Sequence, residues 1–139
     1  MKKKLEGRYI DYTLRVKSLG VGPAAGVARN TRVQTTRLKN FQKRLPRFKA
    51  LRRAGIDTAR IVRTGGTAAL MHGFGGMGVA PTMLLHQRRA AMAAAAPKNG
   101  LGGQQLEVAL IIADGSRKGK MYPAFPAHID VVHHWAQAI

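Results

Sequence analysis

Residues 37–55 read RLKNFQKRLPRFKALRRAG, and they contain the clearest helical pattern of the sequence. Its apolar residues recur at steps of three and four: Leu38, Phe41, Leu45, Phe48 and Leu51. This spacing places them on one face of a helix, which would bury that face against the rest of the protein. We therefore expect a helical protein whose first helices lie in this stretch.

The ends of these helices are marked by residues that cap or break a helix. Asn30 or Thr31 can cap the start. Pro46 lacks an amide hydrogen, so it should kink the helix or divide it into two. Gly55 predicts the end, and Asp57 predicts the cap of a following helix.

The polar face of the same stretch is basic. Ten Lys and Arg residues lie between Gly26 and Gly55, and no Asp or Glu lies among them. A solvated helix face usually mixes positive and negative charges. Here the positive charges repel one another, and a bound polyanion would lower this repulsion. The residues expected to contact nucleic acid are Arg32, Arg37, Lys39, Lys43, Arg44, Arg47, Lys49, Arg52, Arg53, Arg60 and Arg63.

Length and charge support this interpretation. The 139 residues suit one domain, and a formal net charge of +18 with a pI near 11.6 favours a polyanionic partner, with nucleic acid first. Residues 1–63 hold 18 of the 24 Lys and Arg residues. A membrane partner is not expected, because no apolar run approaches the ~18 residues that a span needs.

The flanking segments complete the expected fold. Residues 8–16 alternate apolar and polar side chains, which predicts a short strand or hairpin. Downstream, Gly65 and Gly66 should interrupt the helical chain, and helices are expected over 67–72, from Pro81 to about Ala95, and near the end of the sequence. The predicted class is mainly α, with a short β element in residues 1–26 and a helical body in residues 27–139.

The stretch GFGGMG, residues 73–78, matches the spacing of a dinucleotide-binding loop. Such a loop needs a strand before it and an acid about 20 residues beyond it. Residues 67–72 do not have a strand pattern, and the next acid is Glu107. We therefore expect a joint between two helices, with no cofactor bound.

No catalytic or metal site is expected from this chain alone. It has no cysteine, its only serines are Ser18 and Ser116, and its acids are scattered singly. The five histidines do not form a pair at i and i+4, so a metal site is not predicted.

Several short motifs together resemble the reverse transcriptases of non-LTR retrotransposons. Residues 16–21 (VKSLGV), followed by a glycine-rich loop, resemble the element that closes the palm of these RNA-directed DNA polymerases. The basic stretch 31–54, the segment 54–60 (AGIDTAR) and the Arg-Arg pair at 88–89 are similar to the thumb and connecting region that follows.

The resemblance implies a nucleic-acid-binding fragment without its own catalytic site. The Tyr-x-Asp-Asp motif of the palm is absent, so no catalytic residue can be assigned. The fragment would grip the backbone of a template–primer duplex (RNA or RNA/DNA) and would work with the missing palm and fingers of a longer polymerase. It would be intracellular, and nuclear if it derives from a retrotransposon. The alternative is a basic ribosomal or ribosome-associated RNA-binding protein, which the size and charge also suit.

Overall fold

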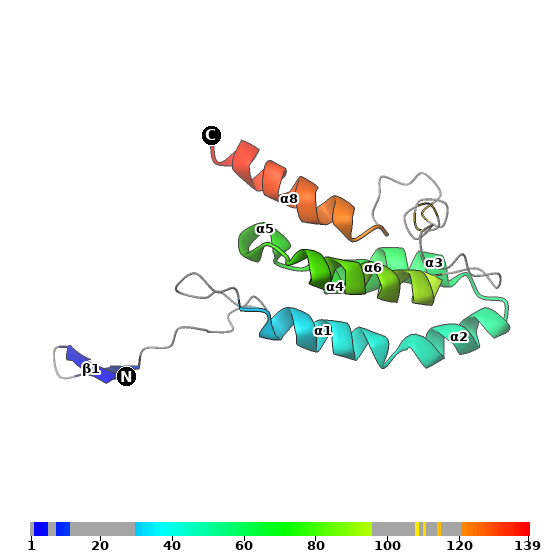
Figure 1. Cartoon of the computed structure of the whole chain (residues 1–139), viewed down its shortest axis with the longest axis horizontal. Coiled ribbons are helices and arrows are strands. Elements are labelled where there is room, and N and C mark those ends of the chain that lie inside the picture. The colour runs from blue at the N-terminus through cyan, green and yellow to red at the C-terminus, as the bar shows by residue number, and fades with distance from the viewer. Residues whose placement is uncertain are drawn as a thin grey trace.

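The computed structural model describes residues 2–5, 8–11, 30–95 and 121–139, together with Val108, Leu110 and Asp114. The described part is mainly helical, which confirms the expected class (Figure 1). Its elements are β1 (Lys2–Leu5), β2 (Arg8–Asp11), α1 (Arg32–Gln42), α2 (Leu45–Arg53), α3 (Thr58–Ile61), the π-helix η1 (Val62–Gly66), α4 (Thr67–Met71), α5 (Phe74–Met77), α6 (Pro81–Ala95) and α8 (Ala124–Gln137).

The two strands pair with each other in an antiparallel hairpin. Lys2 lies opposite Asp11, and Leu5 lies opposite Arg8. The sequence predicted a strand over residues 8–16, but residues 12–29 lie outside the described part of the chain. The part of the proposed β element that extends beyond Asp11 therefore stays a prediction.

Helices α1 and α2 form where the apolar spacing placed them. Leu38, Phe41 and Phe48 are buried, and the rings of Phe41 and Phe48 meet with centroids 5.7 Å apart and tilted by 32°. Pro46 lies in the first turn of α2, where its missing amide hydrogen costs no helical hydrogen bond. The proline thus divides the two helices, which was one of its two expected effects.

Gly55 ends α2, and Asp57 begins α3. Gly55 has a φ of 82° and allows two closing hydrogen bonds, from the Ile56 amide to the Leu51 carbonyl and from the Gly55 amide to the Arg52 carbonyl, both at 3.0 Å. The Asp57 carboxylate then accepts a hydrogen bond from the Ala59 amide at 2.9 Å and caps α3. Both boundaries predicted from the sequence are confirmed.

The expected interruption at Gly65 and Gly66 is confirmed in part, because α4 begins at Thr67 as predicted but the π-helix η1, and no break in the helix, precedes it. The backbone stays helical from Thr58 to Met71, with a single π-helical stretch, η1, in its middle. The reason lies in packing. A Cβ atom on Gly66 would stand 2.9 Å from the Phe41 ring, whereas one on Gly65 would meet nothing within 4 Å. Gly66 is therefore the point at which α1 approaches this helical segment closely.

The helices lie in layers, with α1 and α2 on one side, α4 and α6 in the middle, and α8 on the other side (Figure 1). The fully buried side chains between them include Val62, Leu70 and Met121. Two buried hydroxyl groups tie the layers together. Thr58 donates to the Ala94 carbonyl at 2.8 Å, and Thr67 donates to the Met121 carbonyl at 3.2 Å.

The stretch GFGGMG forms the joint between α4 and α6. Gly73 and Gly78 have φ values of 80° and 63°, a conformation that glycine adopts without strain, and they enclose α5. Phe74 anchors this short helix in the core with 1% of its surface exposed. The dinucleotide-loop alternative required a strand before Gly73, where the structure has helix α4.

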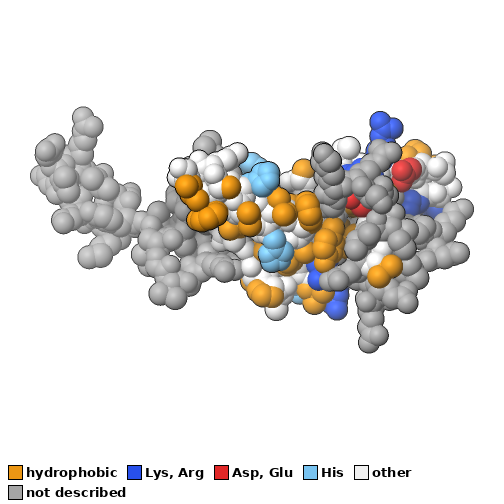
Figure 2. Space-filling view, turned by 90° about the horizontal axis from the view of Figure 1, so that it is seen from above, with side chains coloured by type: hydrophobic (Ala, Val, Ile, Leu, Met, Phe, Trp, Pro, Cys, Tyr) orange, Lys and Arg blue, Asp and Glu red, His pale blue; other side chains and the backbone are white. Residues whose placement is uncertain are grey.

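Helix α8 matches the helix expected near the end of the sequence, but much of its apolar surface is exposed. Ala124 and Ala127 are buried, and α8 packs against α5. On the outer side of the same helix, hydrophobic side chains gather at the surface (Figure 2). The periodicity that predicted the helix was carried largely by residues of this outer side.

We predict that Gly66→Ala destabilises the protein relative to Gly65→Ala. The added methyl group must displace the buried Phe41 ring, which should cost about 1–3 kcal/mol. The methyl group at Gly65 has open space and should add about 0.5–1 kcal/mol by restricting the unfolded chain. Urea unfolding of the two variants measures the difference.

A second change tests the cause. Phe41→Leu shortens the side chain that meets the new methyl group, so it should cost less in the Gly66→Ala background than in the wild type. Equal unfolding free energies for the two alanine variants would contradict the close approach.

Candidate nucleic-acid interface

The structure places most of the expected nucleic-acid-binding residues on one layer, which we call the basic layer and define as residues 32–53. Nine of the eleven lie there, on α1, on α2 or in the turn between them, while Arg60 lies on α3 and Arg63 on η1. Eight of the eleven side chains are exposed: Arg32, Lys39, Lys43, Arg44, Arg47, Lys49, Arg53 and Arg60. Arg37, Arg52 and Arg63 are half-buried.

Core packing sets the direction of these cations. The buried residues of α1 are Val33, Gln34, Leu38 and Phe41. An α-helix has 3.6 residues per turn, so the opposite, solvent-facing side of α1 carries a stripe formed by Arg32, Lys39 and Lys43. The basic stripe is a direct consequence of burying the apolar one.

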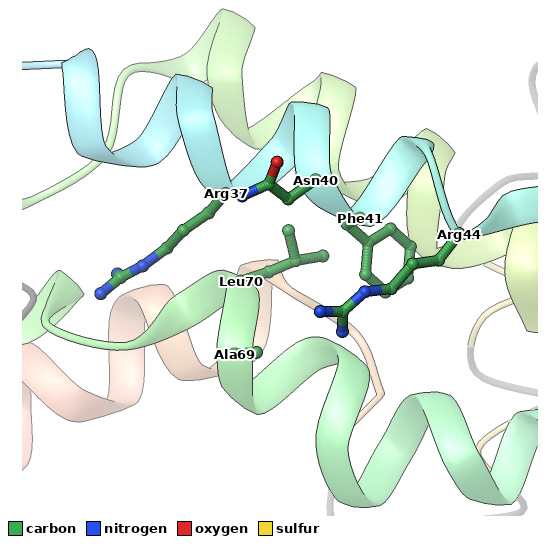
Figure 3. A pocket seen from close by; sticks show the side chains of 6 residues that line it. All are labelled: Arg37, Asn40, Phe41, Arg44, Ala69 and Leu70. Atoms are coloured by element: carbon green, nitrogen blue, oxygen red, sulfur yellow. The ribbon is translucent and has the colours of Figure 1, made fainter.

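Beside this stripe, a hollow of about 190 Å³ lies between α1 and α4. Its lining includes Arg37, Asn40 and Arg44 from the basic layer, over an apolar floor of Phe41 and Leu70 (Figure 3). The two arginines extend toward α4 on either side of Leu70 (Figure 3). A guanidinium group can donate two parallel hydrogen bonds to two oxygens of one phosphate. This arrangement of two arginines is therefore chemically suited to a phosphate group.

The two arginines of the hollow differ in how they are held. Arg37 donates a hydrogen bond from Nη1 to the His72 carbonyl at 2.6 Å. Partial burial lowers the pKa of the Arg37 guanidinium through loss of hydration. An arginine keeps its charge at neutral pH even so. Arg44 is exposed, which leaves its guanidinium accessible to an anion.

Gln34 is a structural residue that the basic pattern did not reveal. It is 3% exposed, and its Nε2 atom donates to the Gly78 carbonyl at 2.8 Å. Arg37 bonds the residue before GFGGMG and Gln34 bonds the last residue of it, so α1 fixes both ends of the glycine joint. The sequence did contain a sign that Gln34 is buried. Gln34, Leu38 and Phe41 occupy positions i, i+4 and i+7 and therefore lie on the same face of the helix.

Arg63 is held by the protein itself. Its Nη1 atom donates to the Asp114 carbonyl at 3.3 Å, and the Asp114 carboxylate accepts a hydrogen bond from the Met121 amide at 3.2 Å. Arg63 therefore helps to fix the segment before α8, a role that its charge alone did not indicate.

Other kinds of site find little support in the part of the chain that is described. Within it, no three His, Asp or Glu side chains come close enough together to hold a metal ion. None of its helices has the length and apolar character needed to cross a bilayer.

Comparison with known proteins found no match to a family model, to a curated protein or to a solved structure.

We predict that Arg37→Gln and Arg44→Gln have different effects on stability. Arg37→Gln removes the hydrogen bond to the His72 carbonyl and should lower the unfolding free energy by about 1 kcal/mol. Arg44→Gln changes an exposed side chain of the same type and should leave stability within ~0.5 kcal/mol. Urea unfolding of the two variants measures this, and equal losses would show that Arg37 does not anchor the glycine joint.

Proposed function

We propose that this protein binds the sugar–phosphate backbone of nucleic acid through its basic layer. The observation that carries the proposal is the exposure, on one layer, of seven cations from a stretch without a single Asp or Glu. These charges repel one another in the free protein. Phosphates would relieve this repulsion and release bound counterions, which favours binding most at low salt.

The composition of the basic layer favours nucleic acid over a lipid surface. A helix that lies in a membrane interface needs a large apolar face beside its cations. The exposed side chains of residues 32–53 are cations, Thr36, Asn40, Gln42, Pro46 and Ala50. Its large apolar side chains are buried or half-buried, so this layer offers nothing to insert into lipid.

The same composition favours a duplex over a single strand as the partner. Sequence-tolerant single-strand binders present exposed aromatic rings on which bases stack. The aromatic residues of the basic layer, Phe41 and Phe48, are buried. Contacts would then be to phosphates, and a duplex with its regular backbone is the partner that such a layer fits best.

A more specific form of the proposal follows from the resemblance to reverse transcriptases of non-LTR retrotransposons. In this form, the short β element of residues 1–26 corresponds to the end of a palm, and the helical body of residues 27–139 acts as a thumb. The thumb would grip the template–primer duplex, while a palm and fingers outside this sequence would supply catalysis. The absence of the polymerase carboxylates from the sequence agrees with a gripping role.

A second candidate function is the binding of ribosomal RNA as a structural protein. The observation in its favour is the combination of 139 residues, a net charge of +18 and a pI near 11.6. The two candidates share the basic layer and differ in partner.

We predict that replacing Lys39, Lys43, Arg44 and Arg47 together with Gln weakens binding to an RNA/DNA hybrid duplex. The slope of log K against log salt should become shallower by up to about 3.6, since each of the four lost phosphate contacts removes about 0.9 from it. Fluorescence anisotropy over a salt series measures the slope. Arg89→Gln is the control, because Arg89 is an exposed arginine on α6, outside the basic layer. An unchanged slope in the fourfold variant would place the contact elsewhere.

Competition between partners separates the two candidate functions. A thumb-like grip predicts that hybrid duplexes of unrelated sequence bind with affinities within about threefold of one another, because phosphate contacts carry no sequence information. It also predicts that the protein sediments free of ribosomes after a moderate salt wash. Retention on washed ribosomes, with clearly weaker binding to hybrid duplex, would favour the ribosomal alternative.

A further inference from the structure

Helix α8 carries an apolar stripe on the side that faces away from α5. Its residues, which we call the α8 seam, are Phe125, Ile129, Val132, Ala136 and Ile139, the last lying just beyond the helix end. All five are exposed, with fractions that rise from 37% at Ile129 and 42% at Phe125 to 56% at Val132 and 87% at Ile139. Figure 2 looks onto this side of the molecule and shows the hydrophobic side chains gathered there.

The spacing of the seam identifies the shape of its partner. Its residues follow one another at steps of four, three, four and three. This is the heptad spacing of coiled coils, in which side chains of one helix insert between side chains of the other (knobs-into-holes packing). A partner helix with the same spacing would fit the seam.

The exposed area is large for a face without a partner. With side-chain areas on the order of 150–250 Å², the exposed apolar side chains of α8, including Trp135 and Val131, present roughly 600 Å². The largest apolar patch on a soluble monomer is typically about 300–600 Å² and is often functional, so this face lies at the upper end of that range. Two such faces pressed together approach the ~800 Å² per partner of a standard interface.

Charge points to a second copy of the same chain. Two molecules of net charge +18 repel each other over most orientations. Residues 121–139 contain no Lys or Arg, and α8 lies on the side of the molecule opposite α1 and α2 (Figure 1). Contact through α8 therefore keeps the two basic layers as far apart as the fold allows. The lack of Lys and Arg within residues 121–139 also makes an anionic membrane a poor partner for this helix.

We propose that two copies of this protein form a symmetric dimer through the α8 seam, with the two helices antiparallel. Val132 lies at the centre of the seam and meets Val132 of the second copy. An antiparallel pairing sets Phe125 against Ile139 and Ile129 against Ala136, so that each small Ala136 faces a larger side chain. A parallel pairing would set the two Ala136 methyl groups against each other and leave a gap. The antiparallel arrangement also brings each helix N-terminus near the C-terminus of the other, which the helix dipoles favour.

The single tryptophan of the chain makes the proposal directly measurable. Trp135 is 67% exposed and borders the seam, one residue before Ala136. Pairing through the seam would remove part of the indole from water. Its emission should then shift to shorter wavelength as the concentration of the full chain rises from about 1 to about 200 µM, over the range in which sedimentation equilibrium shows monomers giving way to dimers.

Two variants with the same added charge test the position of the interface. Val132→Asp places a carboxylate at the centre of the seam and should hold the protein monomeric throughout this concentration range, with constant Trp135 emission. Gln137→Asp places the same charge on an exposed residue of α8 outside the seam, and should dimerise as the wild type does. Circular dichroism checks that both variants keep their helices.

Three results would overturn the proposal. A wild-type protein that stays monomeric at every concentration would overturn it, whatever the variants show. Equal loss of dimer in both variants would show that α8 seam packing is not the cause. A monomer whose Trp135 emission shifts only on addition of phosphatidylcholine vesicles would assign the seam to a membrane surface instead.

Discussion

The Phe41 ring packs against the backbone of Gly66, and this contact positions the first helices of the protein. It brings α1 against η1 and α4 at a distance that a Cβ atom on Gly66 would not permit. The same ring meets Phe48 and so aligns α2 with α1. With these apolar side chains turned inward, the Lys and Arg residues between them have only the outer surface left. One buried contact thus determines both the core and the direction of the charge.

The polar side chains of α1 extend this effect to the glycine joint. Gln34 and Arg37 bond the carbonyls of Gly78 and His72, so α1 fixes the two ends of the segment that connects α4 to α6. Arg37 also lines the hollow beside Arg44. The structural and the proposed binding roles therefore meet in one side chain, whereas Arg44 is available for binding alone. If α8 pairs two copies, the dimer would present two basic layers on its outer sides, and a long nucleic acid could engage both.

The sequence predicted the elements well because their signals are local. The apolar steps from Leu38 to Phe48, the break at Pro46 and the caps at Gly55 and Asp57 each depend on neighbours within one or two helical turns. Gly66 was misjudged because its role is to admit a ring from another helix, and glycine alone does not distinguish an interruption from a close approach. Gln34 and Arg63 were missed as structural links because their partners lie 44 and 51 residues away. For α8, the spacing of the apolar residues predicted a helix, but this spacing does not indicate which side of the helix packs against the core.

Core packing turns most cations of residues 32–53 outward, and we propose that they meet a nucleic-acid backbone there. Lysine acetylation read by mass spectrometry, with and without an RNA/DNA hybrid duplex, tests it most directly, because Lys39, Lys43 and Lys49 are all exposed in this layer. We expect these three lysines to react freely in the protein alone and to be protected when the duplex is bound. Undiminished reactivity of all three in the presence of bound duplex would contradict the account.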